Sequence, residues 1–341
     1  MKHLIFCIFL IISGIIAHGQ TVSEKKDLKV GLVLSGGGAK GFAHIGVIKV
    51  LEEAGVRVDY IAGTSMGAVI GGLYASGYNA HQLDSIIKST DFDHIIKDDV
   101  PRSAKTFYEK EDAERYAITL PFDSFKLSIP QSLSKGQNTY NLLAQTLDHV
   151  SDIQEFNRLP IPFLCIATNA ENGKQVVLEN GYLPEAIGAS GALPSLFSPV
   201  EIDGKLLIDG GVSNNYPVQE LLEKGVDIVI GVDVQDDLRT KDKLNTAPEI
   251  LIQINNYRAI EAMEAKKDST DIYLRPDVKE FSVVSFGDKS EIIDRGIKAA
   301  LTQLEALQEI VSQQSKSAHK KELKSSMQKH PIPQDLSLIH I

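Results

Sequence analysis

The pentapeptide Gly63-Thr64-Ser65-Met66-Gly67 limits the possible fold more than any other stretch of the chain. It has the form G-x-S-x-G, in which a serine stands on a sharp turn between a strand and a helix with its hydroxyl exposed. An apolar run at 58–62 precedes it, and small and apolar residues at 66–76 follow it. We therefore predict a strand, a tight turn and a helix, with Gly63 and Gly67 leaving room for the two elements to pass closely.

The same order of elements occurs on both sides of this turn. Residues 29–34 predict a strand, and the apolar positions between 40 and 53 recur with the period of a helix. The pattern resumes with apolar runs at 161–168, 206–208 and 227–234. Strands alternating with helices indicate an α/β fold whose central, mostly parallel sheet is covered on both faces.

A glycine-rich loop follows the first predicted strand. Consecutive backbone N–H groups of Gly36, Gly37 and Gly38, just before a helix that starts near Lys40, are typical of a loop that binds an oxyanion. Gly36, Gly38 and Gly41 also match the G-x-G-x-x-G pattern of a dinucleotide site, which requires an acidic residue at the end of the second strand. Asp59 lies at roughly the required distance but precedes that strand's last residues, and Ser65 stands where the acid belongs, so the sequence favours an oxyanion loop.

A serine nucleophile needs a base, and Asp209 is the strongest candidate. Asp209-Gly210-Gly211 follows the apolar run 206–208, whereas the histidines after it lie in a polar tail, at His319, His330 and His340. The carboxyl ends of parallel strands share one edge of a sheet, so we expect Asp209, Ser65 and the glycine loop to meet there. The alternative is that Asp209 only caps a turn.

Composition and charge exclude some classes of protein. The 341 residues are 43% hydrophobic and carry a net charge of −10, which argues against nucleic-acid binding. No Cys or His cluster has the spacing of a metal site. Cys165 lies in an apolar run, which predicts a buried structural thiol.

The ends of the chain and one internal segment differ from the α/β pattern. Lys2, the apolar run 4–12 and Ala17-His18-Gly19 predict a signal peptide over residues 1–19 and hence export; an uncleaved anchor is the alternative. Residues 29–312 predict the catalytic domain, interrupted by a cap insert over about 91–159 with a hairpin and a helix around 139–149. Residues 313–341 predict a polar linker or tail.

The motifs in this order resemble those of the bacterial patatin-like phospholipases. The glycine loop with Lys40, the serine turn, Ala189-Ser190-Gly191-Ala192-Leu193-Pro194, and Asp209-Gly210-Gly211 followed by Asn214, Asn215 and Pro217 correspond to the family's four blocks. The resemblance covers roughly residues 29–235. It implies a three-layer patatin-like fold and a Ser65–Asp209 dyad that hydrolyses acyl esters of lipids, without metal or cofactor.

The resemblance also suggests partners and a location. Phospholipid or another acyl-ester lipid is the expected substrate, at a membrane surface. The signal peptide and the cap insert are similar to the exported patatins whose passenger precedes an outer-membrane barrel, which implies a periplasmic, outer-membrane-associated or secreted protein. The alternative function is a non-catalytic passenger domain that binds lipid or a partner. The sequence does not indicate the oligomeric state.

Overall fold

The computed structural model describes three long stretches of the chain, residues 27–98, 132–238 and 265–315, with short pieces between them at 122–123, 126–127, 240–241, 244, 253, 257 and 260–263. The predicted signal peptide at 1–19 lies outside the described residues. So do nearly all of the predicted tail at 313–341 and most of the predicted cap insert between residues 99 and 131.

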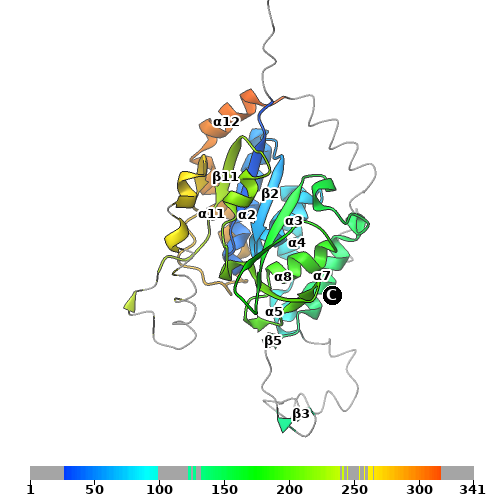
Figure 1. Ribbon diagram of the computed structural model, residues 1–341. Coiled ribbons are helices and arrows are strands. Elements are labelled where there is room, and N and C mark those ends of the chain that lie inside the picture. Colours follow the sequence, from blue (N-terminus) through cyan, green and yellow to red (C-terminus); the bar gives the residue numbers. More distant parts are fainter. Residues whose placement is uncertain are drawn as a thin grey trace, which may run out of the picture.

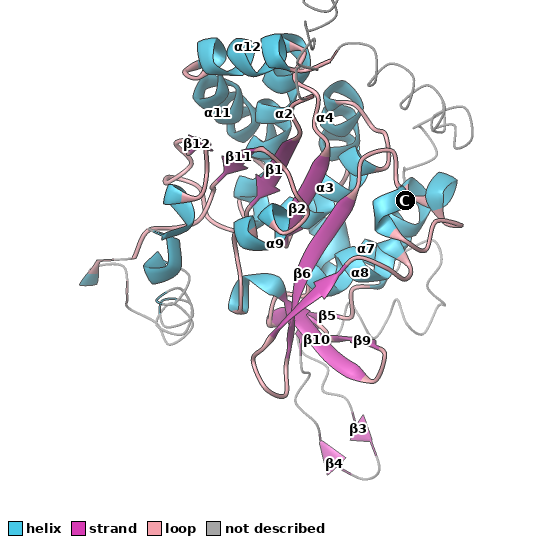
Figure 2. Ribbon diagram, turned by 45° about the horizontal axis from the view of Figure 1, so that its top comes forward, coloured by secondary structure: helices cyan, strands magenta, loops and turns pink. Residues whose placement is uncertain are grey.

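An eight-stranded mixed sheet forms the centre of the molecule (Figures 1 and 2). Its main path runs β12-β11-β1-β2-β6-β10-β9, and β7 pairs with β6. The strands from β12 to β6 run parallel, whereas β7, β9 and β10 are antiparallel to their neighbours. In chain order the strands are β1 (Val30–Leu34), β2 (Tyr60–Thr64), β6 (Phe163–Asn169), β7 (Gln175–Leu178), β9 (Val200–Ile202), β10 (Lys205–Asp209), β11 (Ile228–Val232) and β12 (Ile272–Leu274).

Helices cover both faces of this sheet, so the predicted α/β architecture with a mostly parallel sheet is confirmed. Successive residues of a strand point to opposite faces. Leu32 and Leu34 accordingly belong to the larger apolar core, and Val33 belongs to a smaller one. The larger core packs under α2 (Ala43–Ala54), α3 (Met66–Ala75), α4 (Ala80–Ser89), α7 (Gln137–Thr146), α8 (Leu183–Ser190), α11 (Lys289–Leu301) and α12 (Leu304–Gln313). The smaller core includes the buried residues of α9 (Val218–Leu222).

Strand β10 corrects one expectation. The expectation that Asp209 ends a strand parallel to the others is wrong, because β10 runs antiparallel to β6, but Asp209 still lies beside Ser65 at the carboxyl end of β2. Strand β2 pairs with β6 as far as Ile166, and β10 pairs with it from Ala167 onward. Strand β7 occupies the other side of β6 at both positions, so β2 and β10 lie on the same side, end to end. Their carboxyl ends therefore face each other.

The segment between β2 and β6 contains the cap elements that the structure describes. The predicted cap insert begins with helix α5 (Phe92–Lys97). Helix α7 covers nearly the same residues as the helix predicted around 139–149. The short strands β3 (Phe122–Asp123) and β4 (Lys126–Leu127) pair antiparallel. Strand β5 (Ser132–Ser134) pairs in parallel with β8 (Ser195–Phe197), which ties the insert to the segment after α8.

Four short 3-10 helices complete the described elements, and two of them belong to the site below. They are η1 (Gly38–Phe42), η2 (Asp148–Val150), η3 (Phe156–Arg158) and η4 (Gly210–Val212). None of the helices in the described part of the chain is both long enough and apolar enough to span a bilayer.

Candidate active site

Ser65 stands on a strained turn between β2 and α3. Its φ of 54° and ψ of −123° lie outside the regions that residues with a side chain prefer. The flanking glycines are required by space: a Cβ on Gly67 would lie 2.2 Å from the Leu34 carbonyl oxygen, and one on Gly63 would lie 2.5 Å from the Gly67 carbonyl oxygen. The turn thus projects the Ser65 side chain from the sheet at the start of α3.

The Ser65 hydroxyl contacts a buried carboxylate. Ser65 Oγ donates to Asp209 Oδ2 at 2.6 Å, and the Gly211 N–H donates to Asp209 Oδ1 at 2.7 Å. Asp209 is only 4% exposed, and this burial raises the pKa of its carboxyl to about 6, although both hydrogen bonds act in the opposite direction. The pair comes together because β2 and β10 end against each other beside β6.

The glycine loop has two backbone N–H groups without an acceptor in the described stretches. The N–H of Gly36 is bonded to Asn215, and that of Ala39 donates to the Val283 carbonyl at 2.9 Å. Across the described stretches, no acceptor is found for the N–H of Gly37 or Gly38, and both residues line the cavity beside Ser65. Gly38 has a φ of 57°, and a Cβ there would lie 2.3 Å from the Val283 oxygen, so only glycine fits.

Lys40 lies in the first turn after this loop, but its charge is already paired. Its side chain is buried, and its ammonium bonds to Asp236 Oδ1 at 2.5 Å. Asp236 follows β11, so the ion pair ties the glycine loop to the neighbouring strand. Lys40 and Asp236 both line the cavity, where their opposite charges offset each other.

Ser190 is a site residue that the argument from chemistry did not find. The Ser65 N–H donates to Ser190 Oγ at 3.0 Å, and Ser190 Oγ donates to the Ile166 carbonyl at 2.5 Å. Ser190 thus holds the strained backbone of Ser65 to the end of β6. Its only sequence signal is its place in the 189–194 block. Asn215 was likewise noted only as a residue that follows the aspartate motif.

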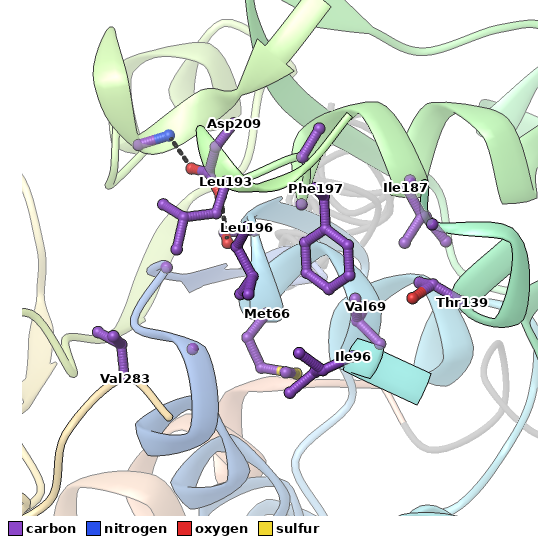
Figure 3. Close-up of a pocket in the computed structure, with 18 of the residues that line it drawn as sticks. Met66, Val69, Ile96, Thr139, Ile187, Leu193, Leu196, Phe197, Asp209 and Val283 are labelled. Carbon is purple, nitrogen blue, oxygen red and sulfur yellow. Dashed lines mark hydrogen bonds between the residues drawn. The ribbon is translucent and has the colours of Figure 1, made fainter. Parts of the chain in front are cut away.

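An apolar cavity of about 890 Å³ opens beside Ser65. Helices α3, α4, α5, α7 and α8 contribute mostly aliphatic side chains to its wall, and Figure 3 shows Met66, Ile96 and Phe197 pointing into it. Asp209 lies at one side of the cavity, next to Leu193. The arrangement therefore places a serine–carboxylate pair at the wall of a space suited to hydrocarbon chains.

The other groups considered from the sequence lie away from this chemistry. Asp59 accepts hydrogen bonds from the Val30 N–H and from Arg57 at the start of the strands, the end opposite Ser65, so it does not stand where a ribose would be bound. Cys165 is buried, as predicted, and burial raises the pKa of its thiol. Within the described residues, no three His, Cys, Asp or Glu side chains cluster to hold a metal ion.

Comparison with known proteins agrees with this site. Residues 32–222, which contain the glycine loop, the serine turn, Ser190 and Asp209, match the family described as patatin-like phospholipase. The chain belongs to the patatin-like phospholipase family. The family consists of lipid acyl hydrolases, and the match covers more than half of the chain.

Curated relatives in this family include fungal proteins named lysophospholipase NTE1. The protein from Mycosarcoma maydis is 29% identical over 303 residues, which is 82% of this chain and 15% of the fungal protein. The protein from Candida glabrata is 30% identical over 305 residues, covering 82% of this chain and 16% of the relative. The chain thus spans less than a fifth of the length of these relatives.

Among solved structures, VipD from Legionella pneumophila is similar over 82% of this chain and 67% of its own, with 17% sequence identity and a TM-score of 0.48.

Proposed function

We propose that this patatin-like protein is a phospholipase A or lysophospholipase-like enzyme that cleaves acyl esters of membrane lipids through Ser65 and Asp209. The observation that carries the proposal is the 2.6 Å hydrogen bond between Ser65 Oγ and Asp209 Oδ2 at the wall of the apolar cavity. The names of the fungal relatives agree with this substrate class.

In the first half of the reaction, Ser65 Oγ attacks the ester carbonyl carbon while its proton passes to Asp209. The N–H groups of Gly37 and Gly38 donate to the oxyanion that develops on the carbonyl oxygen. As the carbon–oxygen bond to the alcohol breaks, Asp209 returns the proton to the leaving oxygen. The products of this half are the free alcohol or lysolipid and an acyl group on Ser65.

In the second half, a water molecule loses a proton to Asp209 and attacks the acyl carbon. The bond to Ser65 Oγ then breaks, Asp209 returns the proton to Ser65, and a fatty acid is released. A carboxyl with a pKa of about 6 is suited to this role, because it is ionised at neutral pH yet a stronger base than an ordinary aspartate.

The test is fatty-acid release from phospholipid and lysophospholipid vesicles by the protein and by Ser65→Ala, together with labelling by a fluorophosphonate probe. We expect release and labelling in the unmodified protein and neither in Ser65→Ala. Absence of labelling on Ser65 in folded protein would instead favour the lipid- or partner-binding alternative.

The location of the protein is a separate part of the proposal. The pattern of residues 1–19 supports export, and the resemblance to exported patatins supports a site of action at or near the outer membrane. Expression of the full chain in a Gram-negative host, followed by fractionation and N-terminal sequencing, tests it. A mature N-terminus near Gln20 outside the cytoplasm is expected, and a cytoplasmic protein that keeps its first residues would contradict it.

A further inference from the structure

The side chain of Asn215 lies between the glycine loop and the aspartate motif. Asn215 Oδ1 accepts from the Gly36 N–H at 3.2 Å, and Asn215 Nδ2 donates to the Gly36 carbonyl at 3.3 Å. The carboxamide therefore binds both polar groups of one glycine, and this pair of bonds defines which atom of the amide is oxygen. Gly36 directly precedes Gly37 and Gly38, which line the cavity and whose N–H groups have no acceptor in the described structure.

Contact distances place the same oxygen against the base motif and near the nucleophile. A Cβ on Gly211 would lie 2.8 Å from Asn215 Oδ1 and 2.9 Å from Asp209 Oδ1. A Cβ on Gly36 would lie 2.4 Å from Asn215 Oδ1 and 2.9 Å from the Ser65 Cβ. No side chain is tolerated at either glycine, so Asn215 occupies the space between the loop and the dyad.

The backbone next to Asn215 is bound to the serine turn as well. Thr64 Oγ1, one residue before Ser65, donates to the Asn214 carbonyl at 3.0 Å, and both residues are buried. On its other side, Asn215 Nδ2 donates to Gln235 Oε1 at 3.0 Å, and Gln235 in turn donates to Asp233 at the end of β11. The dipeptide 214–215 is thus hydrogen-bonded to the glycine loop, to the serine turn, to the segment after β11 and, through the Asn214 N–H and the Gly210 carbonyl, to the aspartate motif.

We propose that Asn215 is a positioning residue that fixes the oxyanion-binding glycines relative to Ser65 and Asp209. The proposal rests on the function proposed above. In the described structure the Asn215 side chain bonds to Gly36 and Gln235 and makes no hydrogen bond to Ser65 Oγ or Asp209, so it acts by holding Gly36, from which Gly37 and Gly38 follow. Its contribution is therefore expected in the transition state, where the loop must meet a developing charge, and not in the binding of the ester.

Two variants test the proposal with a short-chain nitrophenyl ester. Asn215→Ala removes both side-chain hydrogen bonds to Gly36 without adding charge. We therefore expect kcat to fall by ~10–100-fold, with KM nearly unchanged and an unshifted pH profile. Asn215→Asp keeps the volume but replaces the donor to Gly36 with a second acceptor. It also brings a negative charge within the ~6 Å over which like charges raise each other's pKa, so the acid limb of kcat/KM should move to higher pH.

The control for the added charge is Asn172→Asp, in the exposed turn between β6 and β7, which should change neither kcat nor the acid limb. The other charged groups around residues 214–215 are the same in all variants; they are Asp233, the Lys40–Asp236 pair, and Lys266 and Glu220, which bond to the Asn214 side chain. Thermal unfolding reports whether each variant folds. If Asn215→Ala does not fold, the test of the positioning role rests on Asn215→Asp, through its kcat and the acid limb of its kcat/KM profile.

The positioning role would be overturned if the folded variants kept the kcat of the unmodified protein. It would also be overturned if kcat/KM fell only because KM rose. Failure of the proposed function looks different, since it would appear as an inactive unmodified protein or as activity that persists in Ser65→Ala.

Discussion

The two halves of the central sheet bring different parts of the site. The parallel half supplies the glycine loop after β1 and Ser65 after β2, whereas the antiparallel half supplies Asp209 at the end of β10. Ser65 and Asp209 therefore arrive from opposite directions and meet beside Ile166 and Ala167 of β6. Their distance depends on the register of both strands on β6.

The two halves also carry different energetic costs. In the parallel half the cost is backbone strain, since Ser65 adopts a φ of 54° and is held there by Ser190. In the antiparallel half Asp209 has a negative φ of −44° and a ψ of 131°, and the cost is the burial of a carboxylate. The strained turn at Ser65 and the raised pKa of Asp209 thus have separate structural causes.

The largest effect is expected from removing the base while keeping its shape. Asp209→Asn retains an oxygen that accepts from the Gly211 N–H but no longer takes a proton, so kcat/KM should fall by ~10⁴-fold. Asp203→Asn, an exposed carboxylate in the β9–β10 turn of the same half, is the control and should leave kcat/KM unchanged. Activity of Asp209→Asn close to wild type in an ester-hydrolysis assay would remove Asp209 from the chemistry.

The next effect is a dependence on pH that originates in the antiparallel half. Because Asp209 must be ionised to act as a base, kcat/KM should fall tenfold for each pH unit below about 6. A flat profile between pH 4 and 7 would contradict a carboxylate base of raised pKa.

The same shift has an opposite consequence for stability. The pKa is raised from 3.8 to about 6 on folding, so the stabilising contribution of Asp209 is complete below pH 3.8 and is lost as the pH rises through 6. At pH 8, Asp209→Asn should therefore be more stable to denaturant than wild type by about 3 kcal/mol, and the advantage should vanish near pH 4. Burial lowers the pKa of His44 to about 4, so its contribution to stability changes with pH in the opposite direction. That contribution is the same in both proteins and cancels when they are compared.

Adding a Cβ to a tightly packed glycine should lower the free energy of unfolding by a similar amount in either half of the sheet. A Cβ on Gly210 would lie 2.1 Å from the Ile166 carbonyl oxygen, and one on Gly63 would lie 2.5 Å from the Gly67 oxygen. We expect Gly210→Ala and Gly63→Ala to lower the free energy of unfolding by about 3 kcal/mol each in urea titrations. Gly188→Ala in α8 has open space around its Cβ and should not be destabilised. Equal stability of all three variants would show that the two strand ends are not tightly packed.

The smallest effect is expected where the halves are joined through Ser190. Ser190→Ala leaves the Ser65 N–H and the Ile166 carbonyl without their buried partner, which should cost about 1–2 kcal/mol of unfolding free energy. A modest fall in kcat should accompany it as the Ser65 turn relaxes. Ser151→Ala, which removes an exposed hydroxyl, should change neither quantity. A stable Ser190→Ala with full activity would show that the turn holds its own conformation.

Much of the local structure could be read from the chain because short patterns determine it. The apolar runs gave β1, β2, β6 and β11 nearly in place, and the small residues at 66–76 correspond to α3. The direction of β10 could not be read, since an apolar strand pairs in either sense and its partner β6 lies about 40 residues away.

In the site, too, some features follow from local sequence and others depend on tertiary contacts. The glycines and Ser65 follow from the turn they must form, whereas Ser190 and Asn215 have no local pattern that distinguishes a clamp from an ordinary polar residue. Lys40 carries a charge that a sequence argument assigns to the site, yet Asp236, 196 residues away, pairs with it. Such contacts depend on which strands become neighbours.

By itself, the sequence determined the strained turn at Ser65 and the glycine loop, because backbone preferences and the lack of a Cβ act over a few residues. Only the tertiary structure decided that Ser65 meets Asp209 across 144 residues and that burial raises the pKa of that carboxyl. Strand direction and dielectric environment arise from the packing of the whole sheet.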